Sequence, residues 1–412
     1  NENTLYELVS VSKAFTGAGV LLLEEQILLS MNDPIDKYLP WLTMEYKGKP
    51  VDMQSLTLNH FLHHTSGLTN RKHIQSIPQG STPDMLRKTV EILTDTELAF
   101  LPGEKYEYGT VNYDVLGLVI EVVSGQSYES FMTDRVFHPL GLYNTYVYKE
   151  DALATGQLAQ GYRSSFFITS PYDAPDYAGN KPAGYIMSSA KDMARWMSIQ
   201  MGAIQDIPEV FKAVIQKSHN GNFDVSDADG MYYAAGWSVN ADKTIIGHSG
   251  GNPNFSTKAI ILPREYTALC LLTNGNNTNI DMAENIIDIL NGNLTQSYKI
   301  SSIQLWDIIV SSATMIVSLL AIMFFLLGLS RRKMNKQPAN SKKRKLWTVI
   351  WLTATASMCV MCWTFPMLFG CDWQTLLVWQ TYSILAGLIS LVLLTASITF
   401  FVYVRQYNAT SR

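Results

Sequence analysis

Three long apolar runs near the C-terminus restrict what this chain can fold into more than any other feature of its sequence. They cover residues 308–329, 346–370 and 376–404, and the first and third contain no charged side chain. A helix needs roughly 20 apolar residues to span the hydrocarbon of a bilayer. Buried soluble helices are a poor alternative, because three such stretches so close together have no polar faces to turn toward solvent. We therefore expect a membrane domain with three transmembrane helices over residues 301–412.

The segment between the first two runs indicates how this membrane domain is oriented. It reads R-R-K-M-N-K-Q-P-A-N-S-K-K-R-K and carries eight positive charges and no negative charge in fifteen residues. Lys and Arg accumulate in short loops on the cytoplasmic side of a membrane. We expect a multi-pass membrane protein, with residues 1–300 on the extracytoplasmic side and the C-terminus in the cytoplasm.

Residues 1–300 have the composition of a globular domain. They hold 21 Lys and Arg against 33 Asp and Glu, a net charge of −12, and no phosphate-binding glycine loop. We therefore expect no nucleic-acid partner and no cofactor. Of four cysteines only Cys270 lies in this part, so a disulfide framework cannot stabilise it.

The pattern of apolar residues predicts an α+β fold. Helical periodicity starts at residue 12 and recurs over residues 55–65, 83–93, 111–123, 128–136, 189–201 and 281–290. Short β-rich runs separated by turn residues cover residues 232–239, 243–247, 256–262 and 267–273. Helices first and consecutive strands later favour an antiparallel sheet packed against helices.

Ser10 and Lys13 form an S-x-x-K pattern at the start of the first helix. Side chains three residues apart lie on one face of a helix, so the lysine can take the serine proton if burial lowers its pKa. Ser12 points around the helix and is not the candidate nucleophile. The alternative is a capping serine followed by a solvated lysine.

Two further stretches can complete such a site. Tyr108, in the loop P-G-E-K-Y-E-Y-G-T before a helix, could relay a proton, although a tyrosine there could also simply pack in the core. In I-G-H-S-G-G-N-P-N-F, Gly250 and Gly251 allow the backbone to approach a ligand, and the N–H of Gly251 could join that of Ser10 in an oxyanion hole. His248 alone would more often be structural.

A metal site is not expected. His60 and His64 have a spacing that suits metal ligands on a helix, but H-F-L-H-H brings no carboxylate or third ligand.

Taken in order, these motifs resemble the serine β-lactamase and D,D-peptidase superfamily. Within it, the chain is most similar to the membrane-bound D-asparaginyl prodrug peptidases of the colibactin-maturing type. The similar segments are Y-E-L-V-S-V-S-K-A-F-T-G, Y-K-G-K-P, H-H-T-S-G-L, N-Y-D-V-L-G, H-S-G-G-N-P-N-F and D-W-Q-T-L-L-V-W. The resemblance implies an antiparallel sheet flanked by helices with a helical subdomain, followed by three membrane helices. Family members place further strands before S-x-x-K, so we expect this chain to lack an export signal and the first strands.

The resemblance also implies roles for individual residues. Ser10 would be the acylated nucleophile, Lys13 its base and Tyr108 the proton shuttle. Thr110 is an expected substrate contact and stands where the superfamily usually has an asparagine. Asn252 matches the position that contacts a D-asparagine side chain.

Further substrate contacts are expected from His248, Gly250 and Gly251, and from Asn180. Asn180 falls where these peptidases have a histidine. This departure puts the preferred substrate side chain in doubt.

The function implied is removal of an N-acyl-D-asparagine cap from a nonribosomal peptide or polyketide precursor. The expected partners are this N-acylated substrate, the lipid bilayer, an exporter of the precursor and further copies of the chain. Two alternatives remain: a cell-wall D,D-carboxypeptidase, D-amino-acid esterase or β-lactamase-like hydrolase, and a non-catalytic binding or self-resistance protein.

Overall fold

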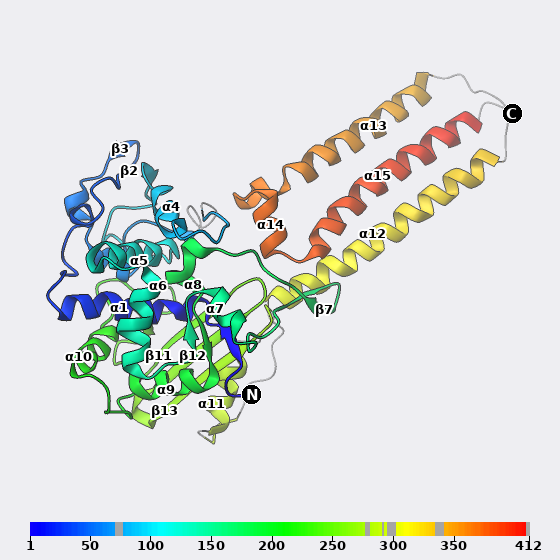
Figure 1. The fold of residues 1–412 in the computed structure, drawn as a ribbon. Coiled ribbons are helices and arrows are strands. Elements are labelled where there is room, and N and C mark those ends of the chain that lie inside the picture. The colour runs from blue at the N-terminus through cyan, green and yellow to red at the C-terminus, as the bar shows by residue number, and fades with distance from the viewer. Residues whose placement is uncertain (71–76, 277–280, 291, 295–301, 334–341, 409–412) are drawn as a thin grey trace. The chain divides into compact units, whose positions relative to one another are not determined.

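The chain divides into two compact units in a computed structural model that describes all residues except 71–76, 277–280, 291, 295–301, 334–341 and 409–412 (Figure 1). The first unit comprises Asn1–Tyr162 and Pro171–Lys299, and the second comprises Arg163–Ser170 and Ile300–Arg412. The short segment 163–170 therefore interrupts the first unit in sequence and belongs structurally with the C-terminal helices.

A five-stranded antiparallel sheet forms the centre of the first unit. Its strands are β9 (Tyr232–Tyr233), β10 (Ser238–Val239), β11 (Ile246–Gly251), β12 (Ser256–Leu262) and β13 (Thr267–Thr273). They pair in the order β13-β12-β11-β10-β9, so each strand lies beside its neighbour in sequence. The predicted antiparallel meander and the α+β fold class are confirmed. The run predicted as one strand over residues 232–239 instead forms two paired strands, β9 and β10, and the strand predicted at residues 243–247 lies at Ile246–Gly251.

Alternation along β12 explains why helices cover both faces of this sheet. Ile260 and Leu262 pack with helix α11 (Asp281–Leu290) on one face. Ala259 and Ile261 belong to the main hydrophobic core on the other face. Successive side chains of a strand point to opposite faces, so an apolar strand with this pattern must be covered twice.

Further elements complete the first unit. Its helices include α1 (Ser12–Glu25), α2 (Leu58–Leu62), α4 (Met85–Glu91), α5 (Val111–Ser124), α6 (Tyr128–Phe131), α7 (Lys149–Ala154), α8 (Lys181–Gly184), α9 (Ala190–Gln200) and α10 (Glu209–Ser218). Two small sheets have the orders β1 (Leu5–Glu7), β8 (Met187–Ser189), β5 (Thr145–Tyr146) and β3 (Lys49–Pro50), β2 (Met44–Tyr46), β4 (Thr96–Glu97).

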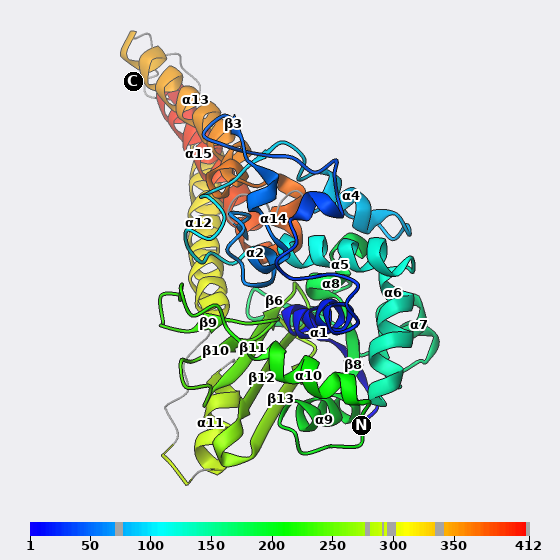
Figure 2. The ribbon, with the colours of Figure 1, turned by 90° about the vertical axis from the view of Figure 1, so that its left-hand side faces the viewer.

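Helix α1 runs through the interior of this unit. All its residues from Ser12 to Leu23 are buried, and it contacts α5, α8 and α10. Figure 2 shows it between the sheet and the helices α5 and α8. A polar side chain on such a helix must find its partners inside the protein, because water cannot supply them.

Three helices of the second unit are long and apolar enough to cross a membrane. They are α12 (Ser302–Lys333), α13 (Lys342–Trp363) and α15 (Tyr382–Asn408), with apolar spans at 304–330, 346–363 and 382–404. Helix α15 packs against both α12 and α13. Residues 334–341 of the basic segment lie outside the described residues, so its predicted loop is not described in full.

The second and third spans are shorter than the sequence predicts. Helix α13 ends at Trp363 and is followed by a 3-10 helix over Phe365–Phe369. Pro366 explains this change, because proline lacks the N–H that would continue an α-helix. The region before the third span forms a separate helix, α14 (Trp373–Trp379), which ends at an extended Gln380.

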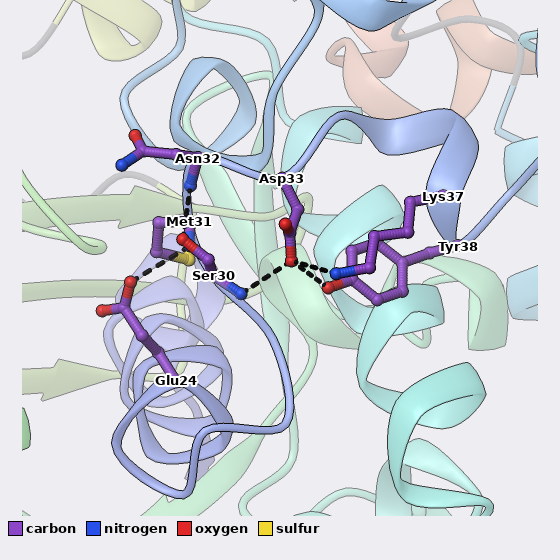
Figure 3. Close-up of polar contacts among 7 residues, drawn as sticks. All are labelled: Glu24, Ser30, Met31, Asn32, Asp33, Lys37 and Tyr38. Atoms are coloured by element: carbon purple, nitrogen blue, oxygen red, sulfur yellow. Dashed lines mark hydrogen bonds and ion pairs between the residues drawn. The ribbon is translucent and has the colours of Figure 1, made fainter.

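The carboxylates of Glu24 and Asp33 both bond the backbone of the turn after α1, and Asp33 makes the larger number of bonds. Figure 3 shows Asp33 accepting hydrogen bonds through Oδ2 from Ser30 N at 2.8 Å, Lys37 Nζ at 2.8 Å and Tyr38 Oη at 2.5 Å. Partial burial would raise the pKa of Asp33, but the hydrogen bonds from Lys37 and Tyr38 outweigh it and lower the pKa. The ionised form of Asp33 therefore stabilises the connection between α1 and the following segment.

Replacing Asp33 with alanine should lower the free energy of unfolding of the full chain by about 1–3 kcal/mol at pH 7, because the N–H of Ser30 and the Tyr38 hydroxyl lose their acceptor. A carboxylate with a lowered pKa contributes stability above its unfolded pKa, and this stability is lost as the pH falls through the folded pKa. The difference in Tm between wild type and D33A should therefore shrink below about pH 4. Asp84, which pairs with Lys88 at the surface, provides the control D84A, for which we expect a smaller change. An equal loss of Tm in both variants would contradict this account.

Candidate active site

Ser10 lies in a 3-10 turn, η1 (Val9–Val11), that leads directly into α1. Val9 has a φ of 52°. A β-branched residue with positive φ is a genuine outlier, and such strain persists only where the surrounding structure imposes it. The buried Ser12 accepts a hydrogen bond from Ile186 N at 3.1 Å. The Ser12 hydroxyl thus has a structural role and does not contact Lys13.

Lys13 is fully buried, and its Nζ has three oxygen neighbours. It lies 3.5 Å from Ser10 Oγ, 3.1 Å from Thr110 Oγ1 and 2.6 Å from the carbonyl oxygen of Ala183. Burial lowers the pKa of Lys13 to about 7, and the nearby Asp114 acts in the opposite direction. A neutral amine donates two hydrogen bonds, which suit Thr110 and the Ala183 carbonyl, and its lone pair is then left for the proton of Ser10.

Tyr108 lies beside this lysine. Nζ of Lys13 is 5.0 Å from the centre of the Tyr108 ring. The Tyr108 hydroxyl is buried and makes no hydrogen bond to any described residue. Burial raises the pKa of Tyr108. At neutral pH Tyr108 is therefore a proton donor, and Lys13 is the better proton acceptor of the two.

The motif H-H-T-S-G-L supports the segment that carries Tyr108. Nδ1 of the buried His64 accepts from Asn112 Nδ2 at 3.1 Å and from Gly109 N at 3.4 Å. Ser66 Oγ donates to Asn112 Oδ1 at 2.5 Å. His60 instead accepts from the N–H of Thr57 at the start of α2. The two histidines with metal-ligand spacing thus serve different structural roles.

Asn70 is a supporting residue that the sequence analysis missed. Its Oδ1 accepts from the N–H of Thr110 at 2.7 Å, and its own N–H donates to the carbonyl of Tyr108 at 2.9 Å. Asn70 therefore holds both ends of the short segment that presents the Tyr108 and Thr110 side chains to Lys13. It follows directly after H-H-T-S-G-L-T, but no pattern in the sequence distinguishes it from a loop asparagine.

His248 on β11 is neutral. It is buried, its Nδ1 donates to the carbonyl of Ser249 at 2.7 Å, and its Nε2 accepts from the Tyr233 hydroxyl at 2.9 Å. Burial, and next the charge on Lys13, lower the pKa of His248 to about 3. This imidazole therefore supplies no positive charge at neutral pH.

The glycines that follow bring β11 against the candidate nucleophile. A Cβ at Gly250 would lie 2.7 Å from the backbone nitrogen of Ser10, so only glycine fits there. A Cβ at Gly251 would meet no atom within 4 Å. The strand thus touches Ser10 at Gly250 and opens toward solvent one residue later.

The side chain of Asn252 is hydrogen-bonded to the buried carboxylate of Glu7. Its Nδ2 donates to Glu7 Oε2 at 2.8 Å and to the carbonyl of Gly184 at 3.3 Å. Since a carbonyl can only accept, these contacts fix the amide nitrogen, and Oδ1 makes no hydrogen bond with the described residues. Burial raises the pKa of Glu7, and the bond from Asn252 acts against this. The sequence analysis missed Glu7. The only feature of the sequence that could have indicated it is its position three residues before Ser10.

Asn180 contacts a second buried acid. Its Nδ2 donates to Asp114 Oδ2 at 2.6 Å. Burial raises the pKa of Asp114 well above its usual value, opposed first by Asn180 and then by Lys13. Asp114 lies on α5, and Asn180 directly precedes α8, which contributes the Ala183 carbonyl. The pair therefore fastens the helix that positions Lys13.

The structure thus brings the residues selected from the sequence into one region. Ser10, Thr110, Gly250 and the Tyr108 ring surround Lys13 or Ser10 directly. The two asparagines lie around the end of α8, where a Cβ at Gly184 would be 3.6 Å from Asn180 Oδ1. A hydroxyl, a lysine with lowered pKa and a protonated phenol can together carry out acyl transfer.

Comparison with known proteins gives a consistent result. A family model described as Beta-lactamase matches residues 1–293. Protein flp of Staphylococcus aureus strain MW2 is 29% identical over 302 residues, covering 73% of this chain and 58% of that protein. In strain MRSA252 the match extends over 410 residues at 27% identity and covers 97% of this chain and 79% of that protein. The chain thus spans less than two thirds of the length of the flp proteins from most of the matched strains.

Two further matches, one in sequence and one in fold, come from other organisms. Penicillin-binding protein 4* of Bacillus subtilis is 28% identical over 289 residues, covering 66% of this chain and 61% of that protein. The octameric penicillin-binding protein homologue from Pyrococcus abyssi superposes with a TM-score of 0.59 at 24% identity, covering 71% of this chain and 67% of that chain. The structural match supports the fold alone.

Proposed function

Because this chain belongs to the Beta-lactamase family of serine hydrolases, we propose that Ser10 forms an acyl-enzyme and that Lys13 is its base. Lys13 takes the proton of Ser10 while Oγ attacks the carbonyl of the substrate. Tyr108 gives its proton to the leaving nitrogen and regains one from the Lys13 ammonium, so the proton balance closes. Water then attacks the acyl-enzyme and releases the acid. The observation that supports this proposal is that Lys13 Nζ lies within 3.5 Å of the oxygens of Ser10, Thr110 and Ala183.

The oxyanion of the tetrahedral intermediate would bind to the N–H groups of Ser10 and Gly251. The close approach at Gly250 supports this, because it brings the end of β11 beside the nitrogen of Ser10. Backbone donors fixed in this way stabilise developing charge without reorganising during the reaction.

We further propose that the substrate carries an N-acyl-D-asparagine cap, removed from an inactive natural-product precursor. The amide of Asn252 supports this proposal, because its nitrogen is held by Glu7 and its oxygen is left for a ligand. A substrate carboxamide offers an N–H donor to that oxygen. The D configuration and the N-acyl group rest on the sequence resemblance.

The neutral state of His248 bears on the alternative, a D,D-carboxypeptidase. Its substrates carry a free carboxylate beside the scissile bond, and binding a carboxylate favours a nearby cation. His248 is buried, and both ring nitrogens are engaged within the protein. One observation supports the alternative: Penicillin-binding protein 4* of Bacillus subtilis is among the relatives of this chain.

The spans of the second unit would hold the first unit at the extracytoplasmic face of a bacterial membrane. An N-acylated substrate partitions into the lipid surface, so a tethered hydrolase meets it at a raised local concentration. We propose this orientation from the basic segment between the first two spans.

The deciding experiment compares chromogenic amides with the full chain in detergent. N-acyl-D-asparaginyl p-nitroanilide should be cleaved, its L-asparaginyl isomer should not, and a peptide ending in D-Ala-D-Ala should be a poor substrate. Preferred cleavage of the D-Ala-D-Ala peptide, together with rapid acylation by a fluorescent penicillin, would establish the alternative. Binding without turnover of any of the three, unaltered in S10A, would indicate a non-catalytic protein.

Asn252 provides a sharper test of the proposed specificity. Replacing it with leucine removes the acceptor for the substrate carboxamide, and an unpaired buried polar group costs about 1–3 kcal/mol. We expect kcat/KM for the D-asparaginyl substrate to fall roughly 10- to 100-fold, with little change for a D-norvaline analogue of similar size. Equal losses for the two substrates would indicate a damaged site rather than a lost specificity contact.

A further inference from the structure

The hairpin inserted between the two parts of the first unit has an unusual turn. It is formed by β6 (Tyr162–Ser165) and β7 (Ile168–Pro171), and Phe166 and Phe167 at its tip have φ values of 54° and 63°. Two-residue turns with positive φ at both positions favour Asn and Gly, because larger side chains are strained there. Two consecutive phenylalanines in this conformation call for a compensating interaction.

Asp307 of α12 provides that interaction. Its carboxylate accepts from Phe166 N at 3.2 Å and from Phe167 N at 3.1 Å. It also accepts from the hydroxyls of Ser311 and Ser383 and is only 3% exposed. The polar backbone of the turn is therefore satisfied inside the second unit.

A buried arginine fixes the base of the hairpin within the same unit. Arg163 is 2% exposed, and its Nη1 donates to the carbonyls of Leu377, Val378 and Gln380 at 2.9–3.3 Å. These carbonyls end helix α14, where the helix dipole favours a cation. The guanidinium also lies 4.0 Å from the centre of the Tyr382 ring.

In contrast to these buried polar groups, the side chains at the tip of the hairpin are apolar and exposed. Phe167 is 55% exposed and Ile168 is 68% exposed, although both are large and apolar. Trp306, the neighbour of Asp307 on α12, is 65% exposed. The segment thus buries Arg163 and gives the turn's backbone N–H groups an acceptor, but it leaves Phe167 and Ile168 exposed beside the exposed Thr169 and Ser170. Large apolar side chains exposed together at a tip are unusual for a hairpin that faces water.

The position of Asp307 sets the depth of this tip. Asp307 lies in the first turn of the apolar span 304–330 and directly precedes the uncharged run 308–329. That run of 22 residues is about 33 Å long as a helix, close to the roughly 30 Å of bilayer hydrocarbon. Asp307 therefore lies at the boundary between hydrocarbon and headgroups, and the hairpin tip bonded to it lies at the same level.

We propose that the tip of the β6–β7 hairpin is a membrane-inserted element, with Phe167 and Ile168 seated in the headgroup region of the bilayer. The occupant of this apolar surface is lipid, because the tip is continuous with a membrane span and aromatic side chains favour the membrane–water interface. This inference rests on the proposed insertion of α12 into a membrane.

The test places a bimane fluorophore on single cysteines of the full chain in proteoliposomes. The parent has Cys270, Cys359, Cys362 and Cys371 replaced by alanine, and the labelled variants are F167C, L319C and L153C. Lipids carrying a nitroxide near the headgroup or near the end of the acyl chain serve as quenchers. Leu319 lies in the middle of α12 and is 65% exposed, and Leu153 of the first unit matches Phe167 at 56% exposed.

The proposal expects fluorescence loss at position 167 with the shallow quencher, at position 319 with the deep quencher, and at position 153 with neither. D307A in the F167C background should abolish the loss at position 167, because the tip is released. Quenching at position 319 without quenching at position 167 overturns the hairpin proposal and leaves membrane insertion standing. Absence of quenching at position 319 overturns the insertion of α12 itself. Energy transfer between labelled tips in place of lipid quenching would assign the surface to a second copy of the chain and equally overturn the proposal.

Discussion

Replacing Ser10 with alanine is expected to lower kcat at least roughly a thousandfold and to abolish covalent labelling. The reason is geometric as well as chemical. Of the hydroxyls near Lys13 Nζ, only that of Ser10 also lies beside the strained backbone of Val9 and the open end of β11. Thr110, the other hydroxyl near Lys13, is held by its backbone to Asn70 and cannot replace it. The measurement is steady-state hydrolysis of the D-asparaginyl amide, with intact-protein mass spectrometry to detect the acyl-enzyme.

Ser12 provides a matched control for this variant. It is two residues away and buried, but its hydroxyl binds the backbone of Ile186. S12A should lose about 1 kcal/mol of stability and retain hydrolysis and labelling. Labelling of S10A, or loss of labelling in S12A at a temperature where both proteins are folded, would assign the nucleophile differently.

The pH dependence of hydrolysis should reveal Lys13 as the base. Its pKa is about 7, and only the neutral amine accepts a proton. The rate of the wild type should therefore fall as the pH drops through about 7 and level off above it. K13R keeps a long cationic side chain but stays protonated throughout, so it should lose activity at every pH. The measurement is kcat/KM from pH 5 to 9 with the full chain.

Asp114 tests the cause of this pKa. In its ionised form Asp114 raises the pKa of Lys13, which opposes the effect of burial. D114N keeps the shape of the side chain and removes the charge, so the acid limb of the rate profile should move to lower pH. An unchanged midpoint in D114N with reduced kcat would show that Asp114 acts through the position of α8 alone. A wild-type profile without an acid limb near pH 7 would exclude Lys13 as the titrating base.

The sequence predicted the elements whose periodicity is strong and local. The strands β12 and β13 and the helices α5 and α11 lie almost where their apolar patterns place them. The helix predicted from residue 55 is shorter, because a 3-10 turn over Met53–Ser55 precedes α2. The first helix starts at Ser12, so Ser10 itself lies in the 3-10 turn before it.

Other parts of the site depend on partners distant in sequence. Glu7 binds Asn252, 245 residues away, and Lys13 donates to Ala183, 170 residues away. Short elements such as α8 and β1 exist because of these tertiary contacts, since four or three residues have almost no intrinsic tendency to form structure. A single sequence shows which residues are capable of catalysis, but it does not show which buried acid is hydrogen-bonded to which asparagine.

Helix α10 illustrates a different failure. Its residues alternate apolar and polar at helical spacing over Glu209–Ser218, and it packs against α1. The apolar pattern is present in the sequence, but the predicted helices do not include this one. Its packing against the helix that carries Lys13 shows that it contributes to the core around the site.

The hairpin between Tyr162 and Pro171 also sets an order of events during synthesis. Phe166 leaves the ribosome 141 residues before Asp307, the carboxylate that binds its N–H. At roughly 5–20 residues per second, this interval lasts about 7–28 seconds. Throughout it Arg163 lacks the carbonyls that surround it in the finished protein, because Leu377 is made still later. The hairpin therefore remains without these polar partners until the last helices of the second unit are translated.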